Sequence, residues 1–90
     1  MESKHRLVIV EDCTILRQGL RSLLGVDSDY EVVGEAADGL DAIREVEKCA
    51  PDLVLLDLSM PKLNGISAMK EIKRLSPGTK ILALTAHENE

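Results

Sequence analysis

Short apolar runs alternate along this chain with segments in which apolar residues recur every three or four positions. Residues 6–10, 53–56 and 80–85 are almost entirely apolar. Runs of this length are typical of strands that are buried on both faces of a sheet. Residues 30–36 mix polar and apolar positions, which predicts an edge strand.

The segment after residue 12 has the periodicity of an amphipathic helix. We expect Asp12 or Thr14 to cap its start and Gly25 to end it. One face carries four leucines at the spacing of a helix that packs on a sheet; they are Leu16, Leu20, Leu23 and Leu24.

Two further helices are predicted between the remaining strands. Asp38 is the expected N-cap of the first, and Pro51 ends it. The second is expected over about residues 66–75, and a run of Ser, Pro and Gly breaks it. The residues expected to face inward are Leu40, Ile43, Val46 and Ala50 in the first helix and Ile66, Met69 and Ile72 in the second.

The order of elements is strand, helix, strand, helix, strand, helix, strand. This alternation predicts an α/β fold in which right-handed crossovers build a parallel sheet with helices on both faces. A length of 90 residues allows one domain, so we expect residues 1–90 to form a single unit.

Composition excludes several classes of function. The chain has 11 basic and 16 acidic residues and a net charge of −5, whereas a nucleic-acid binder or a protein of anionic membrane surfaces needs a basic face. No apolar run approaches the length of a membrane span. Cys13 and Cys49 form neither a disulfide framework nor a zinc pattern, which favours a cytoplasmic protein with reduced thiols.

Polar side chains follow three of the predicted strands. Glu11 and Asp12 follow the first, Asp57 the third, and Thr85 ends the fourth. On its own, Asp57 is better explained as a cap of the loop that follows it. However, parallel strands deliver their carboxyl ends to one edge of the sheet, where ligands bind in doubly wound folds. We therefore expect three carboxylates and a hydroxyl to converge.

Clustered carboxylates resist ionising together, and Mg²⁺ relieves this repulsion because it prefers oxygen ligands. Mg²⁺ also shares its coordination shell with phosphate oxygens. Asp57 is then the expected nucleophile for a phosphoryl group, forming an aspartyl-phosphate. Thr85 is the expected hydroxyl that turns toward the new phosphoryl oxygen.

Several motifs resemble a receiver domain of a two-component response regulator. They are Val10-Glu11-Asp12, residues 55–61, Asn64-Gly65 and Leu84-Thr85-Ala86. The helix opening at Asp38-Gly39 and the strand over residues 30–36 resemble the NarL/LuxR type in particular. The resemblance covers essentially the whole chain. It implies a flavodoxin-like doubly wound sheet of order 2-1-3-4 in a three-layer α/β/α arrangement, with the fifth strand of the family missing.

The resemblance also implies a role for each site residue. Asp57 is the implied phosphoacceptor and Thr85 the switch hydroxyl. Asp12 is expected to bind Mg²⁺ directly, Glu11 through water or a hydrogen bond, and Ser59 through its backbone carbonyl. The implied phosphodonor is a histidine kinase or a small acyl or amide phosphate.

A complete receiver continues with another helix, a fifth strand that ends in an active-site lysine, and a last helix. The chain is therefore expected to be a truncated receiver whose fourth strand is an open apolar edge. Such an edge pairs with other chains, so we expect self-association as a dimer or swapped oligomer. DNA binding is expected only through an output domain outside this chain.

Two other functions stay open. One is a phosphohydrolase with an aspartyl nucleophile, but such enzymes generally carry a second acid two residues later, where this chain has Ser59. The other is a fragment that takes no phosphate and acts only as a self-associating interaction module. We expect a signalling module that transfers a phosphoryl group onto itself rather than an enzyme with turnover.

Overall fold

The computed structural model describes residues 4–26, 29–57 and 65–84. Strands and helices alternate through these ranges, and the strands form one parallel sheet in the order β2-β1-β3-β4. The elements are β1 (His5–Val10), α1 (Thr14–Gly25), β2 (Tyr30–Ala36), α2 (Gly39–Cys49), β3 (Leu53–Asp57), α3 (Gly65–Leu75) and β4 (Lys80–Leu84). The predicted fold class and strand order are confirmed.

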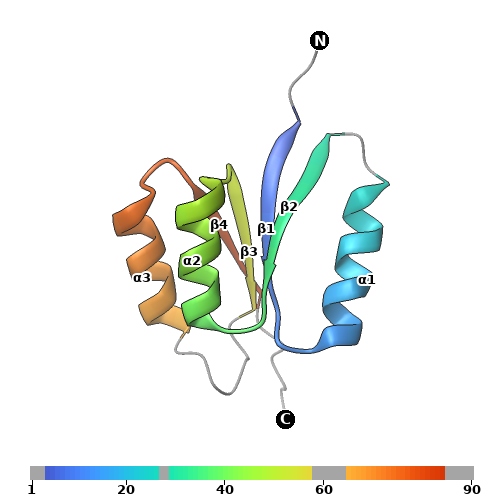
Figure 1. Cartoon of the computed structure of the whole chain (residues 1–90), viewed down its shortest axis with the longest axis horizontal. Helices are drawn as coiled ribbons and strands as arrows, with labels where there is room; N and C mark the ends of the chain where they lie inside the picture. Colours follow the sequence, from blue (N-terminus) through green and yellow to red (C-terminus); the bar gives the residue numbers. More distant parts are fainter. Residues whose placement is uncertain (1–3, 27–28, 58–64, 85–90) are drawn as a thin grey trace.

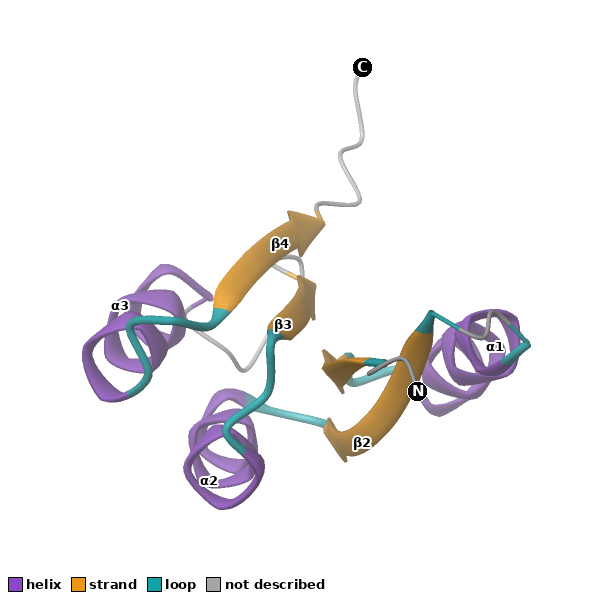
Figure 2. Ribbon diagram, turned by 90° about the horizontal axis from the view of Figure 1, so that it is seen from above, coloured by secondary structure: helices purple, strands orange, loops and turns teal. Residues whose placement is uncertain are grey.

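The sheet lies between two helical layers. Helices α2 and α3 cover one face, and α1 covers the β1–β2 part of the other (Figures 1 and 2). The interior strands β1 and β3 are buried over almost their whole length. Their continuous apolar runs were predicted to reflect burial on both faces of the sheet, and the structure confirms this.

Alternate residues of the interior strands supply two cores. The larger core lies under α2 and α3, and its buried members are Val8, Val10, Ala36, Ala42, Val46, Val54, Leu56 and Ile72. The smaller core contains Leu7, Ile9 and Leu55, against which Leu20 and Leu24 of α1 pack. The two other leucines of the predicted α1 stripe, Leu16 and Leu23, are exposed.

The start of α1 differs from the prediction. Its N-cap is Cys13, and no side chain caps it. Neither Asp12 nor Thr14 has that role, because Asp12 lies in a bend before the cap and Thr14 is already helical. The amide of Cys13 instead donates to Glu11 Oε2 at 3.0 Å. Glu11 therefore satisfies the amide of the N-cap residue, while no side chain of that residue accepts from the first helical amides.

Helix α2 begins as predicted, since the Asp38 side chain accepts a hydrogen bond of 2.9 Å from the Asp41 amide. The predicted inward face is partly wrong. Val46 is buried, but Leu40 is 60% exposed and Ala42 is fully buried. Leu40 lies about 160° around the helix from Ala42, so it cannot share the buried face. Ala50 is exposed and has a left-handed backbone that ends the helix.

Helix α3 shows the same kind of difference. Ile72 is buried and Met69 packs against the larger core, as expected. Ile66 is 57% exposed, whereas Ala68 is buried. Ala68 and Ile72 are one turn apart and therefore define the face toward the sheet.

Part of the sheet has no helix over it in the described ranges. Leu82 and Leu84 of β4 are 51% and 39% exposed. Their register with β3 puts them on the α1 face, but α1 lies over the far side of that face (Figure 2). In the part of the chain that the structure describes, β4 pairs only with β3. No helix there is long and apolar enough to cross a membrane.

Hydrogen bonds join the chain segments that precede β3 and β4. The buried Thr79 hydroxyl donates to the Pro51 carbonyl at 2.7 Å and lies 2.6 Å from the Ser76 hydroxyl. The Lys80 amide donates to the Asp52 carbonyl at 2.9 Å. These contacts set the register of β4 on β3, which brings Leu84 beside Asp57 at the other end.

We predict that Thr79→Val lowers the free energy of unfolding by about 1–3 kcal/mol, because the buried Pro51 carbonyl loses its donor while the side-chain volume is kept. Ser76→Ala should cost less, since Thr79 keeps its bond to Pro51. Urea unfolding of both variants measures the difference. A Thr79→Val loss no larger than that of Ser76→Ala would contradict this prediction.

Candidate functional site

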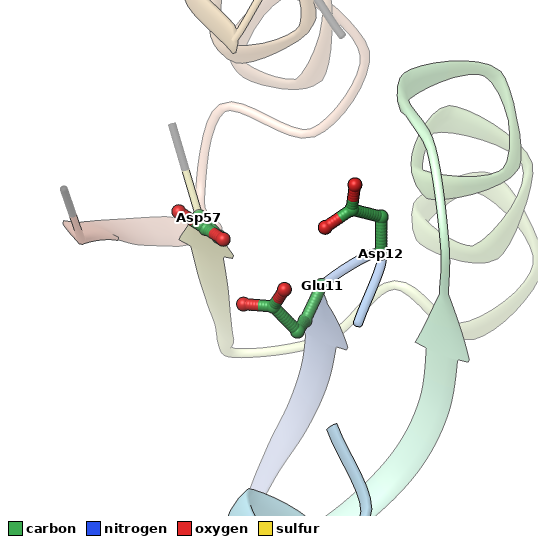
Figure 3. Close-up of side chains that lie close together, drawn as sticks. All are labelled: Glu11, Asp12 and Asp57. Carbon is green, nitrogen blue, oxygen red and sulfur yellow. The ribbon is translucent and has the colours of Figure 1, made fainter. Parts of the chain in front are cut away.

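Three carboxylates meet at the carboxyl edge of the sheet. Val10 pairs with Leu56, so the residues that follow these positions on β1 and β3 leave the sheet side by side. Ligand oxygens of Glu11, Asp12 and Asp57 all lie within 4.8 Å of one another. The three side chains point toward a common space above the strand ends (Figure 3). The predicted convergence of these acids is therefore present.

The three acids differ in their burial. Glu11 is 3% exposed and Asp57 is 9% exposed, whereas Asp12 is exposed to solvent. Loss of solvation, together with the neighbouring Asp57 carboxylate, raises the pKa of Glu11 to about 7. The site thus has a buried floor of two acids and an open side at Asp12.

The acid pair after β1 is fixed by the backbone on both sides. The Glu11 amide donates to the Ala36 carbonyl of β2 at 2.9 Å. The Glu11 carbonyl accepts a hydrogen bond of 2.7 Å from Arg17 Nη1. Because the peptide units of Glu11 are held in this way, the direction in which Asp12 leaves the strand is set by the fold.

The donor set fits a hard divalent cation. Oxygens that share a Mg²⁺ ion at about 2.1 Å lie at most about 4.2 Å apart, close to the spacing of the three carboxylates. Mg²⁺ is reluctant to lose all its water, and the exposed side at Asp12 leaves room for water or phosphate oxygens. Bound there, the ion supplies positive charge that lowers the cost of ionised Glu11 and Asp57.

Two predicted site residues lie outside the described residues. Ser59 was predicted to offer its backbone carbonyl to the metal and Thr85 to act as the switch hydroxyl. Both roles stay predictions. Among the described residues, the assembled part of the site consists of Glu11, Asp12 and Asp57.

Sequence reasoning missed Arg17 and its partner Glu35. Arg17 Nε donates to Glu35 Oε1 at 3.0 Å, and the same guanidinium contacts the carbonyl of Glu11. One signal was available. The amino end of a helix favours acidic residues, but α1 has no acid in its first turn and carries Arg17 at the start of its second turn. A cation so close to the amino end of a helix is unusual, but the pattern does not identify its partner.

Comparison with known proteins identifies the family. The response regulator receiver domain matches residues 7–90. The chain belongs to this family. The predicted identity is therefore confirmed, and accepting a phosphoryl group is the function of receiver domains.

Individual relatives agree with this assignment. The chain is 46% identical over 85 residues to YhcZ, an uncharacterized transcriptional regulatory protein of Bacillus subtilis, covering 94% of this chain and 40% of YhcZ. It is 37% identical over 89 residues to the transcriptional regulatory protein DegU of Brevibacillus brevis, covering 99% of this chain and 38% of DegU. The chain thus spans about two fifths of these relatives.

A crystal structure of a LuxR-family two-component response regulator from Aurantimonas superposes with a TM-score of 0.87 at 37% identity. The match covers 97% of this chain and 62% of that one. The resemblance to receivers of the NarL/LuxR type is borne out by this similarity.

We predict that Glu11 makes the metal-free receiver less stable as pH rises. Its folded pKa of about 7 exceeds the ordinary value of 4.5, so its contribution is fully present below pH 4.5 and is lost as pH rises toward 7. Between pH 5 and 8, wild type should lose roughly 1–3 kcal/mol of unfolding free energy relative to Glu11→Gln.

Urea unfolding of both proteins in a chelator, at several pH values, measures this difference. Glutamine keeps an oxygen that can accept the Cys13 amide, so the comparison isolates the charge. Stability curves that stay parallel over this pH range would contradict the prediction.

Proposed function

We propose that this receiver accepts a phosphoryl group on the Asp57 carboxylate in a Mg²⁺-dependent reaction. The observation that supports the proposal is the convergence of Glu11, Asp12 and Asp57 within 4.8 Å in a chain of the receiver family. A carboxylate held beside a cation site can act as a phosphoryl acceptor, because transfer depends mainly on positioning and charge neutralisation.

Each acid has a separate role in this proposal. Asp12 and Asp57 bind Mg²⁺ directly together with the Ser59 backbone carbonyl, and Glu11 acts through water or a hydrogen bond. An Asp57 oxygen attacks phosphorus and forms an O–P bond. The bond from phosphorus to the donor breaks, and its electron pair leaves with the donor's imidazole, carboxylate or amide nitrogen. As the switch hydroxyl, Thr85 then donates a hydrogen bond to an oxygen of the new phosphoryl group.

The donor in this proposal is the phosphohistidine of a histidine kinase, or a small acyl or amide phosphate. We expect one transfer onto the chain rather than turnover of a substrate, because the position two residues after Asp57 is Ser59 and offers no general acid. The relatives are transcriptional regulatory proteins more than twice as long as this chain. We therefore propose a cytoplasmic regulator whose DNA contacts belong to another domain.

Intact-mass spectrometry after incubation with Mg²⁺ and acetyl phosphate tests the phosphorylation. Wild type should gain one phosphoryl group, and omission of Mg²⁺ or the change Asp57→Asn should abolish the gain. Asp52→Asn is the matched control, since Asp52 precedes the same strand at the opposite edge and its amide replacement can still accept the Arg6 backbone donor. Equal mass gain in wild type and Asp57→Asn would contradict the proposal.

We also propose that the described part of the chain associates with a second copy through β4. The support is the exposure of Leu82 and Leu84 on a strand that pairs only with β3 within the described ranges. Apolar edge strands are templates for pairing with another chain, and charged residues on such edges prevent it.

Sedimentation velocity at high micromolar concentration tests this association. Wild type should sediment as a dimer or larger species, and Leu82→Lys should shift the population to monomer. Leu40→Lys is the control, because Leu40 is also exposed but lies on α2, on the other side of the sheet. A monomeric wild type, or equal effects of the two lysines, would argue against β4 as the interface.

A further inference from the structure

Arg17 is the one cation among the described residues that contacts the backbone of the acidic site. Its side chain is 18% exposed, and it comes from the second turn of α1. One guanidinium nitrogen, Nη1, donates to the Glu11 carbonyl at 2.7 Å, and another, Nε, donates to Glu35 Oε1 at 3.0 Å. A planar guanidinium presents its donors in a rigid fork, whereas the ammonium of a lysine is a point charge on a flexible stem.

Glu35 holds Arg17 in that geometry. It lies on β2 beside Ile9 of β1, and its carboxylate is 22% exposed. Because both partners of this ion pair are mostly buried, the pair is screened less than an exposed one and its position is better defined. Arg17 therefore connects three segments, which are α1, β2 and the peptide that follows β1.

That peptide decides where Asp12 points. The Glu11 amide is already bonded to Ala36 of β2, and the bond from Arg17 fixes the carbonyl at the other side of the same residue. With both groups held, Asp12 leaves the strand toward Asp57 (Figure 3). Loss of the Arg17 bond would remove the restraint on the peptide between Glu11 and Asp12, and with it a restraint on the position of the Asp12 carboxylate.

We propose that Arg17, held by Glu35, is a positioning residue for the cation site. It acts through the Glu11 carbonyl and touches neither the ion nor the phosphoryl group. This inference rests on the proposed Mg²⁺-dependent function. Residues that orient metal ligands from outside the coordination shell typically change metal affinity by about 10- to 100-fold when they are replaced.

Arg21 provides a matched control. It bonds the same Glu35 carboxylate from the next turn of α1, but its side chain is 61% exposed, and its described contact is with Glu35 rather than Glu11. Loss of Arg21 therefore removes an ion pair with Glu35 and leaves the bond to the Glu11 carbonyl in place. If the Arg17–Glu35 and Arg21–Glu35 ion pairs only stabilise the fold, replacing either arginine should change Mg²⁺ affinity by a similar factor.

Calorimetric titration with Mg²⁺ compares wild type, Arg17→Met and Arg21→Met without using phosphorylation as a readout. We expect Arg17→Met to weaken Mg²⁺ binding about tenfold or more, and Arg21→Met to change it less than about twofold. Amide exchange in the metal-free state gives a second readout. The Glu11 and Cys13 amides should exchange faster in Arg17→Met but not in Arg21→Met.

Equal Mg²⁺ affinities of the two variants, or an unchanged affinity in Arg17→Met, would overturn the positioning role. If Arg17→Met does not fold, Arg17→Lys and Arg21→Lys replace the pair, and only the former should weaken binding. Failure of the proposed function has a different signature. Wild type itself would then bind no Mg²⁺ and take no phosphoryl group, which would remove the basis of this inference as well.

Discussion

Burial of two carboxylates side by side is the constraint on which the site depends. Glu11 and Asp57 are largely removed from water because β1 and β3 are the interior strands of the sheet. Desolvation and the neighbouring Asp57 carboxylate oppose the ionisation of Glu11 and raise its pKa to about 7. Holding the two carboxylates together lowers the free energy of unfolding. A cation that binds only the folded chain would raise it again.

The two edges of the sheet differ in the same physical terms. At the amino edge, polar groups pair with the protein itself, as the Thr79 hydroxyl does with the Pro51 carbonyl. At the carboxyl edge, the fold gathers like charges and fixes their backbone with hydrogen bonds to Glu11. Hydrogen bonds at the amino edge fix the register of the strands. The carboxyl edge holds the three carboxylates around a space that is open to solvent beside Asp12.

The sequence was sufficient for the elements, the parallel sheet and the meeting of the acids, because these follow from apolar runs and from the direction of parallel strands. The strand order came from the resemblance to receiver domains. It was insufficient where a small residue faces the core, since Ala42 and Ala68 give a weaker apolar signal than Leu40 and Ile66. It also missed the pair of Arg17 and Glu35, whose partners are 18 residues apart and meet only after α1 packs on β2. Local patterns mark Arg17 as an unusual cation near the start of α1, but they do not identify its partner.

The most direct test of the account is paramagnetic line broadening by Mn²⁺, a hard cation that takes the same oxygen ligands as Mg²⁺. Traces of Mn²⁺ should first remove the amide NMR signals of Glu11, Asp12, Cys13 and Asp57. The signals of His5 and Lys80, at the opposite edge of the sheet, should persist, and excess Mg²⁺ should restore those that were lost. Broadening spread over exposed acids such as Glu47, or absent at the carboxyl edge, would contradict a single cation site formed by the three carboxylates.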